Sequence, residues 1–249
     1  MTPISHITSI SLDKVIFKYS DALKPTFDNL SVTLPVDQNI LIAGEVGQGT
    51  STLLKLIAVV HQPQQGAVLI NGFNTSQMSF EEFLPLRNKI GYTFDYGGLF
   101  ANRSLLENMT LPLLYHNTFT YDESCELGIK MAAHFGFTNK LNEKPASVTG
   151  GLRKLVSVLR TLMMNPEMLV MDDPFMGVDS QNVARLIRIL NERRERGEIR
   201  HLFLTSRDIS WAKQLDCKTL HITGGQFDFS DMTSGNGSGV NSGTASEAA

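Results

Sequence analysis

The chain has 249 residues, of which 42% are hydrophobic and 19% are charged, and its formal net charge is −3. This length allows a full hydrophobic core, and the weakly acidic balance lacks the basic footprint of a protein that binds nucleic acid. Because no hydrophobic run approaches the roughly 20 residues of a membrane-spanning helix, and residues 1–8 lack the pattern of a signal peptide, we expect a cytoplasmic globular protein with no nucleic-acid partner.

Short strands are expected in the N-terminal part of the chain. Hydrophobic residues alternate from Ile10 to Tyr19, and further hydrophobic runs cover residues 30–34 and 67–70, the last one directly before the turn Asn71-Gly72. Alternation bounded by turn residues is typical of strands that are buried on one face. The sequence therefore predicts an N-terminal antiparallel β-subdomain.

A glycine-rich loop follows a predicted strand at 39–43 and precedes a predicted helix at 51–60. Residues 44–52 read G-E-V-G-Q-G-T-S-T. In the pattern G-x-x-x-x-G-K-[ST], backbone N–H groups surround phosphate oxygens, the lysine contacts the outer phosphates, and the hydroxyl holds Mg²⁺. Here Thr50 takes the lysine position and Ser51 keeps the hydroxyl, while Lys55 is expected to point away from the loop. The candidate phosphate contacts are Gly44, Gly47, Gly49, Thr50, Ser51 and Thr52.

The second half of the chain alternates helical and strand patterns. Helical patterns replace strand patterns at about 95–165, so a helical lobe is predicted there, and short buried strands are expected at 168–171 and 202–204. This order favours an α/β fold around a parallel sheet over residues 1–230. Residues 231–249 are mostly Gly, Ser, Thr, Ala and Asn and are predicted to form a disordered tail. Cys125 and Cys217 lack metal-ligand spacing and are read as reduced thiols.

Two further motifs are suited to nucleotide chemistry. The predicted strand at 168–171 ends in Asp172 and Asp173, where an aspartate can reach Mg²⁺ held by the loop hydroxyl. Thr149 then marks a helix N-cap before Gly150 and Gly151, which offer a hydroxyl and open backbone N–H groups to an anion. A Thr-Gly-Gly helix entry is common by itself, and it is the order of the motifs that favours the nucleotide-binding interpretation.

In this order the motifs resemble those of the nucleotide-binding subunit of ABC transporters, over about residues 9–228. The resemblance implies a P-loop NTPase fold with a RecA-like core, an N-terminal antiparallel β-subdomain and an inserted helical subdomain. It also implies ATP and Mg²⁺ as cofactors. Implied roles are adenine stacking by Tyr19, a Walker A loop at 44–52, a Q-loop metal contact at Asp95, a signature at 148–152, a Walker B metal ligand at Asp172, a D-loop at 177–179 and a switch position at Ser206.

Five positions that do chemistry in that family are replaced here, and we expect them to converge on one site. Loss of the lysine removes a charge that stabilises the outer phosphates. A carboxylate that is one methylene shorter falls roughly 1 Å short of the attacking water, a displacement that can cost about 100-fold in rate. We therefore expect impaired hydrolysis and weak binding of ATP and Mg²⁺. The replacements are Thr50 for lysine, Asp95 for the Q-loop glutamine, Leu152 for the signature glutamine, Asp173 for the catalytic glutamate and Ser206 for the switch histidine.

Within the family, several segments resemble the ATPase subunit of Mla-type, Mce-associated phospholipid transport. They cover residues 97–100, 107–109, 111–113 and above all 173–179, which read D-P-F-M-G-V-D. This resemblance implies lipid transport.

Three functions remain open at this point. The chain is either the energy subunit of a transporter, docked on a membrane permease near residues 95–113 at the inner face of the membrane, or a pseudo-ATPase that serves as a structural or regulatory dimer partner. The third alternative is a soluble ABC-type protein that is not linked to transport. For the first two, the family architecture implies a homodimer or a heterodimer with another ATPase subunit.

Overall fold

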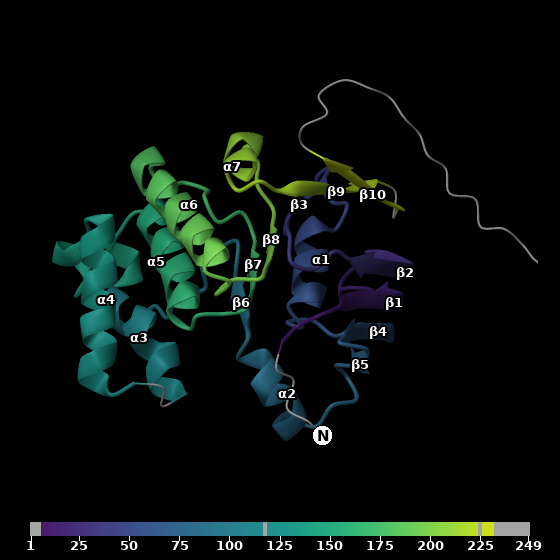
Figure 1. Ribbon diagram of the computed structural model, residues 1–249, viewed down its shortest axis with the longest axis horizontal. Helices are drawn as coiled ribbons and strands as arrows, with labels where there is room; N and C mark the ends of the chain where they lie inside the picture. Colours follow the sequence, from purple (N-terminus) through teal and green to yellow (C-terminus); the bar gives the residue numbers. More distant parts are fainter. Residues whose placement is uncertain (1–5, 117–118, 224–225, 232–249) are drawn as a thin grey trace, which may run out of the picture.

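The computed structural model describes residues 6–116, 119–223 and 226–231. The predicted tail lies outside the described residues from position 232 onward, and so do residues 1–5. Two β-sheets enclose one helix, and further helices cover the opposite face of the larger sheet (Figure 1).

The smaller sheet is formed by the N-terminal part of the chain. Its strand order is β2-β1-β4-β5, and its neighbouring strands are antiparallel, which confirms the predicted antiparallel subdomain. The first strand ends two residues earlier than the alternating pattern suggested. The strands are β1 (Ile10–Phe17), β2 (Phe27–Leu34), β4 (Gln65–Ile70) and β5 (Phe73–Asn74).

The larger sheet has the strand order β10-β9-β3-β8-β7-β6. All its pairings are parallel except that of β10 with β9. The expected strands at 39–43, 168–171 and 202–204 are present in its centre, whereas β6, β9 and β10 were not predicted. The strands are β3 (Asn39–Gly44), β6 (Ile90–Thr93), β7 (Met168–Met171), β8 (His201–Leu204), β9 (Lys218–Thr223) and β10 (Gln226–Asp231).

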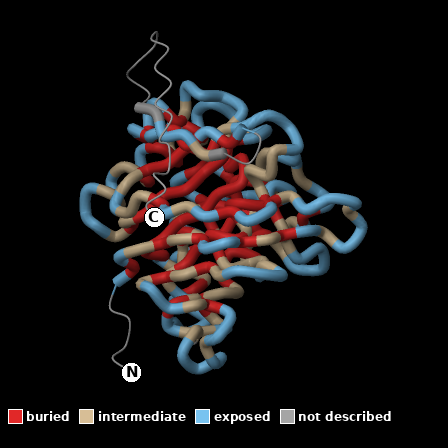
Figure 2. Tube along the Cα trace, turned by 90° about the vertical axis from the view of Figure 1, so that its right-hand side faces the viewer, coloured by how far each residue is buried: buried red, intermediate tan, exposed pale blue. Residues whose placement is uncertain are grey.

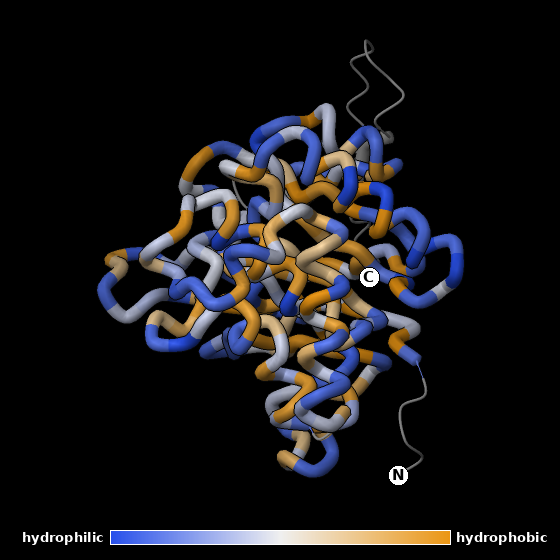
Figure 3. Tube along the Cα trace, turned by 90° about the vertical axis from the view of Figure 1, so that its left-hand side faces the viewer, coloured by the Kyte–Doolittle hydropathy of each residue, from blue (hydrophilic) through white to orange (hydrophobic). Residues whose placement is uncertain are grey.

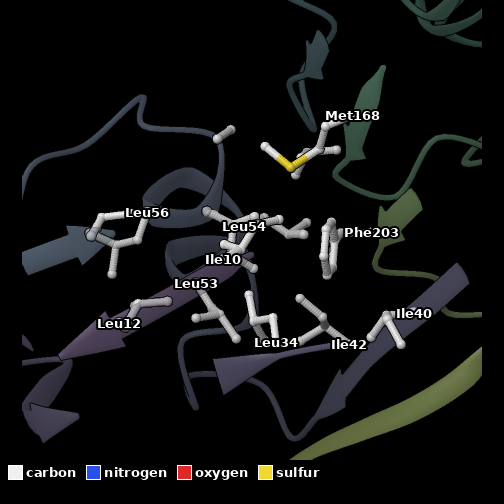
Figure 4. Packing of buried hydrophobic residues seen from close by; sticks show 14 of the residues in the cluster. Ile10, Leu12, Leu34, Ile40, Ile42, Leu53, Leu54, Leu56, Met168 and Phe203 are labelled. Carbon is white, nitrogen blue, oxygen red and sulfur yellow. The ribbon is translucent and has the colours of Figure 1, made fainter. Parts of the chain in front are cut away.

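Helix α1 (Thr50–Ile57) fills the space between the two sheets. Leu53 and Leu54 lie between strands of the smaller sheet and Phe203 of the larger sheet (Figure 4), and all three side chains are buried. The helix is shorter than the predicted range of 51–60. It ends early because Val59 takes a left-handed backbone with φ +53° and the following N–H groups bond back to the carbonyl of Lys55.

Eight further helical elements of the described chain precede or follow the strands. Between 95 and 165 the described residues form helices and loops without a strand, as the sequence predicted. The α-helices are α2 (Phe80–Arg87), α3 (Leu105–Tyr115), α4 (Tyr121–Phe135), α5 (Gly150–Met163), α6 (Ser180–Glu195) and α7 (Ile209–Gln214), with 3₁₀ turns at Thr138–Lys140 and Pro145–Ser147.

Alternate residues of the central strands enter two different hydrophobic cores. Ile40 and Ile42 pack in the core that contains α1, whereas Leu41 packs in the core that contains α5 and α6. This division follows from the opposite directions of successive side chains in a strand. Buried segments accordingly run through the middle of the molecule (Figure 2), and seen from the side of α3 and α4 most outer loops are hydrophilic (Figure 3).

The segment that joins β6 to α3 is held by a buried side chain. Asn108 accepts a hydrogen bond from the N–H of Phe100 at 2.7 Å, and its amide donates to the carbonyls of Phe100, Arg103 and Ser104 at 2.9–3.2 Å. The side chain of Arg160, on α5, also donates to the carbonyl of Gly98 at 2.9 Å. We call residues 97–104 the clamped segment.

Candidate functional site

A cavity of about 460 Å³ lies at the carboxyl ends of β3, β7 and β8. This edge of a parallel sheet is where α/β proteins bind ligands, and the volume is within the usual range for a small-molecule site. Eight of the predicted site residues line it, and they come from four segments that are distant in sequence. They are Gly44, Gly47, Thr50, Ser51, Asp95, Asp172, Asp173 and Ser206.

The glycine-rich loop has the backbone that an anion cradle requires. Gly47 and Gly49 adopt φ values of +90° and +88°, in the left-handed region that favours glycine. A Cβ at Gly49 would approach side-chain atoms of Thr26 and Phe27 to 2.7 and 2.9 Å, so space also favours glycine there. Gly49 is the N-cap of α1, and without a capping side chain it leaves the first-turn amides for a ligand.

The loop and the end of β7 meet through a hydrogen-bonded network. The hydroxyl of Ser51 donates to Oδ1 of Asp172 at 3.0 Å, and the hydroxyl of Thr205 donates to the same oxygen at 2.8 Å. Thr205 Oγ1 also accepts from the N–H of Asp173 at 2.9 Å. The predicted proximity of Ser51 and Asp172 is therefore observed.

The donor set at this network fits Mg²⁺. Ser51 and Asp172 present hard oxygen atoms side by side in the cavity. Magnesium in nucleotide sites takes one or two protein ligands and completes its shell with phosphate and water oxygens. The described residues contain no cluster of three or more His, Cys, Asp or Glu side chains that could hold a metal ion.

The cavity lining is acidic. Four carboxylates line it, those of Glu45, Asp95, Asp172 and Asp173, against one guanidinium from Arg207 among the described lining residues. Arg207 Nε lies 3.2 Å from Asp173 Oδ2, with the arginine side chain 82% exposed and the aspartate side chain 11% exposed. Burial raises the pKa of Asp173 above its ordinary value, and Arg207 and then Lys154 offset only part of that rise.

A buried lysine lies beneath the cavity. The Lys154 ammonium donates to the backbone carbonyls of Phe94 at 3.1 Å and Asp172 at 3.2 Å, and also to the carbonyl of Asp95. Its Nζ is 3.8 Å from Asp95 Oδ1. Burial lowers the pKa of Lys154, while Asp95 opposes this effect. Lys154 thereby ties the residues after β6 to the end of β7.

Two of the predicted nucleotide contacts, Tyr19 and Thr52, lie close together beside α1. The hydroxyl of Tyr19 lies 3.2 Å from Thr52 Oγ1, and the ring packs edge-on against His61. Lys55 Nζ lies 5.8 Å from the centroid of the Tyr19 ring. Tyr19, Thr52 and Lys55 are not among the residues that line the cavity. Adenine stacking by Tyr19 remains a prediction.

The predicted signature residues lie at the N-terminus of α5, outside the cavity. Thr149 caps the helix by accepting from the N–H of Leu152 at 3.3 Å, and Gly150 is exposed. A Cβ on Gly151 would stand 1.8 Å from the carbonyl oxygen of Gly177, so α5 begins against the loop after β7. Leu152 does not reach the cavity of its own chain, because the start of α5 packs on the loop at Gly177. Its convergence with the other four replaced positions, across a dimer, stays a prediction.

Three residues of the site were not predicted: Thr205, Arg207 and Lys154. Arg207 directly follows Ser206, whose hydroxyl donates to the carbonyl of Asp208 at 3.0 Å and accepts from its N–H at 3.2 Å. This turn presents the arginine toward Asp173. The sequence signal was a basic residue next to the replaced switch position, but its carboxylate partner is 34 positions away.

The sequence is similar to a known protein family and to curated proteins. The family model for ABC transporters matches residues 27–176. The ATP-binding protein LolD of the lipoprotein-releasing system of Wigglesworthia glossinidia brevipalpis is 30% identical over 200 residues, which cover 80% of this chain and 86% of that protein. The methionine import ATP-binding protein MetN 2 of Pectobacterium atrosepticum is 27% identical over 220 residues, which cover 87% of this chain and 64% of that protein.

A solved structure supports the fold. A dimeric post-hydrolysis state of the ATP-binding cassette MJ0796, bound to ADP and Pi, superimposes with a TM-score of 0.79 at 22% identity. The superposition covers 90% of this chain and 98% of that chain. Among the described residues, no helix combines the length and the hydrophobicity that a bilayer span requires.

Proposed function

This chain belongs to the ABC transporter family, and from that membership we propose that it is an ATP-binding subunit that binds Mg²⁺ and ATP weakly and acts on a membrane permease. The observation that carries the proposal is the 3.0 Å contact between Ser51 and Asp172, which joins the phosphate-type loop to the carboxyl end of a buried parallel strand. The cavity around this contact supports ATP as the ligand.

Each part of the cavity has a role toward the nucleotide. The loop backbone from Gly44 to Gly49 and the first-turn amides of α1 would surround phosphate oxygens. Ser51 and Asp172 would hold Mg²⁺, which supplies positive charge between the phosphates when it is bound. Thr205 keeps Asp172 oriented through its 2.8 Å hydrogen bond.

The same residues support weak rather than efficient hydrolysis. Thr50 brings no positive charge to the outer phosphates, and the lining is acidic. Asp173 carries a carboxylate that is one methylene shorter than the glutamate of the family, so it reaches less far toward an attacking water. Ser206 uses its hydroxyl within its own turn. A pseudo-ATPase that acts as a dimer partner is the second candidate, and these observations favour it over an efficient ATPase.

Exposure of the start of α5 supports a role in a dimer. Thr149 and Gly150 are exposed and contribute nothing to the cavity of their own chain. The similar cassette MJ0796 is dimeric in its ADP- and Pi-bound structure. We infer that the signature residues of this chain complete a site in a second copy or in another ATPase subunit.

A second hollow supports docking to a permease. A cavity of about 390 Å³ lies between α2, β6, α3 and α5, close to the predicted docking region at 95–113. Phe80 and Tyr115 line it and are 70% and 76% exposed. Exposed aromatic side chains beside a hollow are typical of protein interfaces. A permease bound there would hold the chain at the inner face of the membrane.

A lipid or lipid-anchored cargo is the substrate class that we propose. The segments at 97–100, 107–113 and 173–179 resemble the phospholipid-transport branch, and the relative LolD belongs to a lipoprotein-releasing system. Methionine import by the relative MetN 2 is the competing indication.

The proposal is tested by affinity purification of the tagged chain from membranes, followed by ATP turnover of the recovered complex. We expect a membrane permease to be recovered and turnover to be slow, with a rise on Thr50→Lys and none left in Ser51→Ala. Recovery of the chain without any membrane protein would favour a protein not linked to transport. Fast turnover in the wild type that Ser51→Ala abolishes would contradict impaired hydrolysis.

A further inference from the structure

The backbone at Arg207 is anchored at the rim of the phosphate cavity. It lies in the short connection between β8 and α7, which Thr205 anchors to Asp172 and to the N–H of Asp173. The turn between Ser206 and Asp208 then directs the arginine across the cavity edge, where its Nε meets Asp173 Oδ2 at 3.2 Å. The arginine thus lies beside the Ser51–Asp172 contact.

The other cations near the cavity are already engaged. Lys55 lies over the Tyr19 ring, and Lys154 donates to three backbone carbonyls beneath the cavity. Thr50 occupies the loop position where a lysine would contact the outer phosphates. Among the described residues that line the cavity, Arg207 is therefore the basic side chain that an entering triphosphate would meet.

The chemistry of Arg207 suits an outer phosphate. A guanidinium presents several N–H donors in a plane and pairs with phosphate through two parallel hydrogen bonds. The Arg207 side chain is 82% exposed, so it is free to turn toward a ligand without unpacking the core. By turning, Arg207 would lose its contact with Asp173, which solvent partly screens. It would gain a contact with a phosphate group, which carries more negative charge.

We propose that Arg207 is the cation that binds the outer phosphate of ATP. This inference rests on the proposed nucleotide site. It assigns to Arg207 the positive charge that Thr50, in the lysine position, does not supply. Binding of ATP exchanges the Arg207–Asp173 pair for an Arg207–phosphate pair and releases the Asp173 carboxylate. Arg207 is thus a specificity residue that distinguishes ATP from ADP.

The test is calorimetric titration of the purified chain with Mg·ATP and with Mg·ADP. Loss of a charge-assisted hydrogen bond lowers affinity by about tenfold or more, so Arg207→Gln should weaken ATP binding by that factor and ADP binding by less than about threefold. The matched control is Arg196→Gln, because Arg196 is also exposed and pairs with a carboxylate, that of Glu198, at 3.8 Å. This control should bind both nucleotides like the wild type.

A rescue variant separates this inference from the proposed function. Adding Thr50→Lys to Arg207→Gln should restore ATP affinity, because the charge returns from the loop side. ATP affinity that Arg207→Gln leaves unchanged would overturn the role of Arg207 alone. Binding that appears with Thr50→Lys but not in the wild type would also overturn it while upholding the loop as a nucleotide site. If neither the wild type nor the Thr50→Lys variant binds ATP, both proposals fall.

Discussion

Substitution of Gly151 by alanine is expected to destabilise the protein through a main-chain collision. A Cβ at position 151 would lie 1.8 Å from the carbonyl oxygen of Gly177 and 2.7 Å from its carbonyl carbon. The ordinary contact distance between a carbon and an oxygen atom is roughly 3.5 Å, so one of the two backbones has to move by about 1.7 Å. Gly177 has φ +73°, a conformation that restricts how its loop can adapt.

The magnitude follows from the rigidity of the obstacle. Overpacking a tight site costs about 1–3 kcal/mol, and we expect the upper half of this range because the contact is with backbone atoms. For a chain of this size, each kcal/mol lowers the melting temperature by about 2–4 °C, so Gly151→Ala should melt about 4–12 °C below the wild type.

Gly150→Ala is the matched control at the neighbouring position. Its Cβ would meet a guanidinium nitrogen of Arg153 at 3.7 Å, which is an ordinary contact. We therefore expect a change within about 0.5 kcal/mol. Urea denaturation of both variants measures the difference in the free energy of unfolding. Equal midpoints for Gly150→Ala and Gly151→Ala would refute the close approach of α5 to the Gly177 loop.

Three other changes have defined expectations. Lys154→Met should lower the free energy of unfolding by about 2–4 kcal/mol in urea denaturation, because three backbone carbonyls lose a buried charged donor; an unchanged midpoint would contradict this. Val59→Gly should be about 1 kcal/mol more stable than Val59→Ala, since both remove the two γ-methyl groups and only alanine keeps a Cβ at φ +53°; equal stabilities would show that this position is unstrained. Burial lowers the pKa of His201, whose Nδ1 accepts a hydrogen bond from the N–H of Asp37. The contribution of His201 to stability is therefore complete above about pH 6.5, and it declines at lower pH by at most about 1.4 kcal/mol per pH unit. His201→Gln should flatten that part of the stability profile, and a profile identical to the wild type would rule out His201 as its cause.

The parts of the fold that the sequence predicted have local signals. The strand at 39–43, the glycine loop and the run at 168–171 each combine hydrophobic residues with turn or motif residues in a short window. Strand β6 was missed because its four residues, I-G-Y-T, include Gly91 and Thr93 and so lack the continuous hydrophobic run of β7. A Cβ at Gly91 would meet Thr161 at 2.6 Å, a reason for glycine that appears only in three dimensions.

The parts of the site that escaped prediction depend on distant contacts. Lys154 follows an arginine at the start of a helix, where a solvated lysine is the ordinary expectation, yet it is 4% exposed and satisfied by carbonyls from two other segments. The role of Arg207 depends on its ion pair with Asp173, and the two residues come close only when the sheet forms. Local patterns carry no information about such pairs.

The clamped segment is hydrogen-bonded to both α3 and α5. Its main-chain groups are fastened by Asn108 from α3 and by Arg160 from α5, and Lys154 fastens the adjoining Asp95. A ligand that moves Asp95 would therefore pull on a segment whose main chain is bonded to α3, and we expect part of that movement to reach the end of α3 that bears Tyr115.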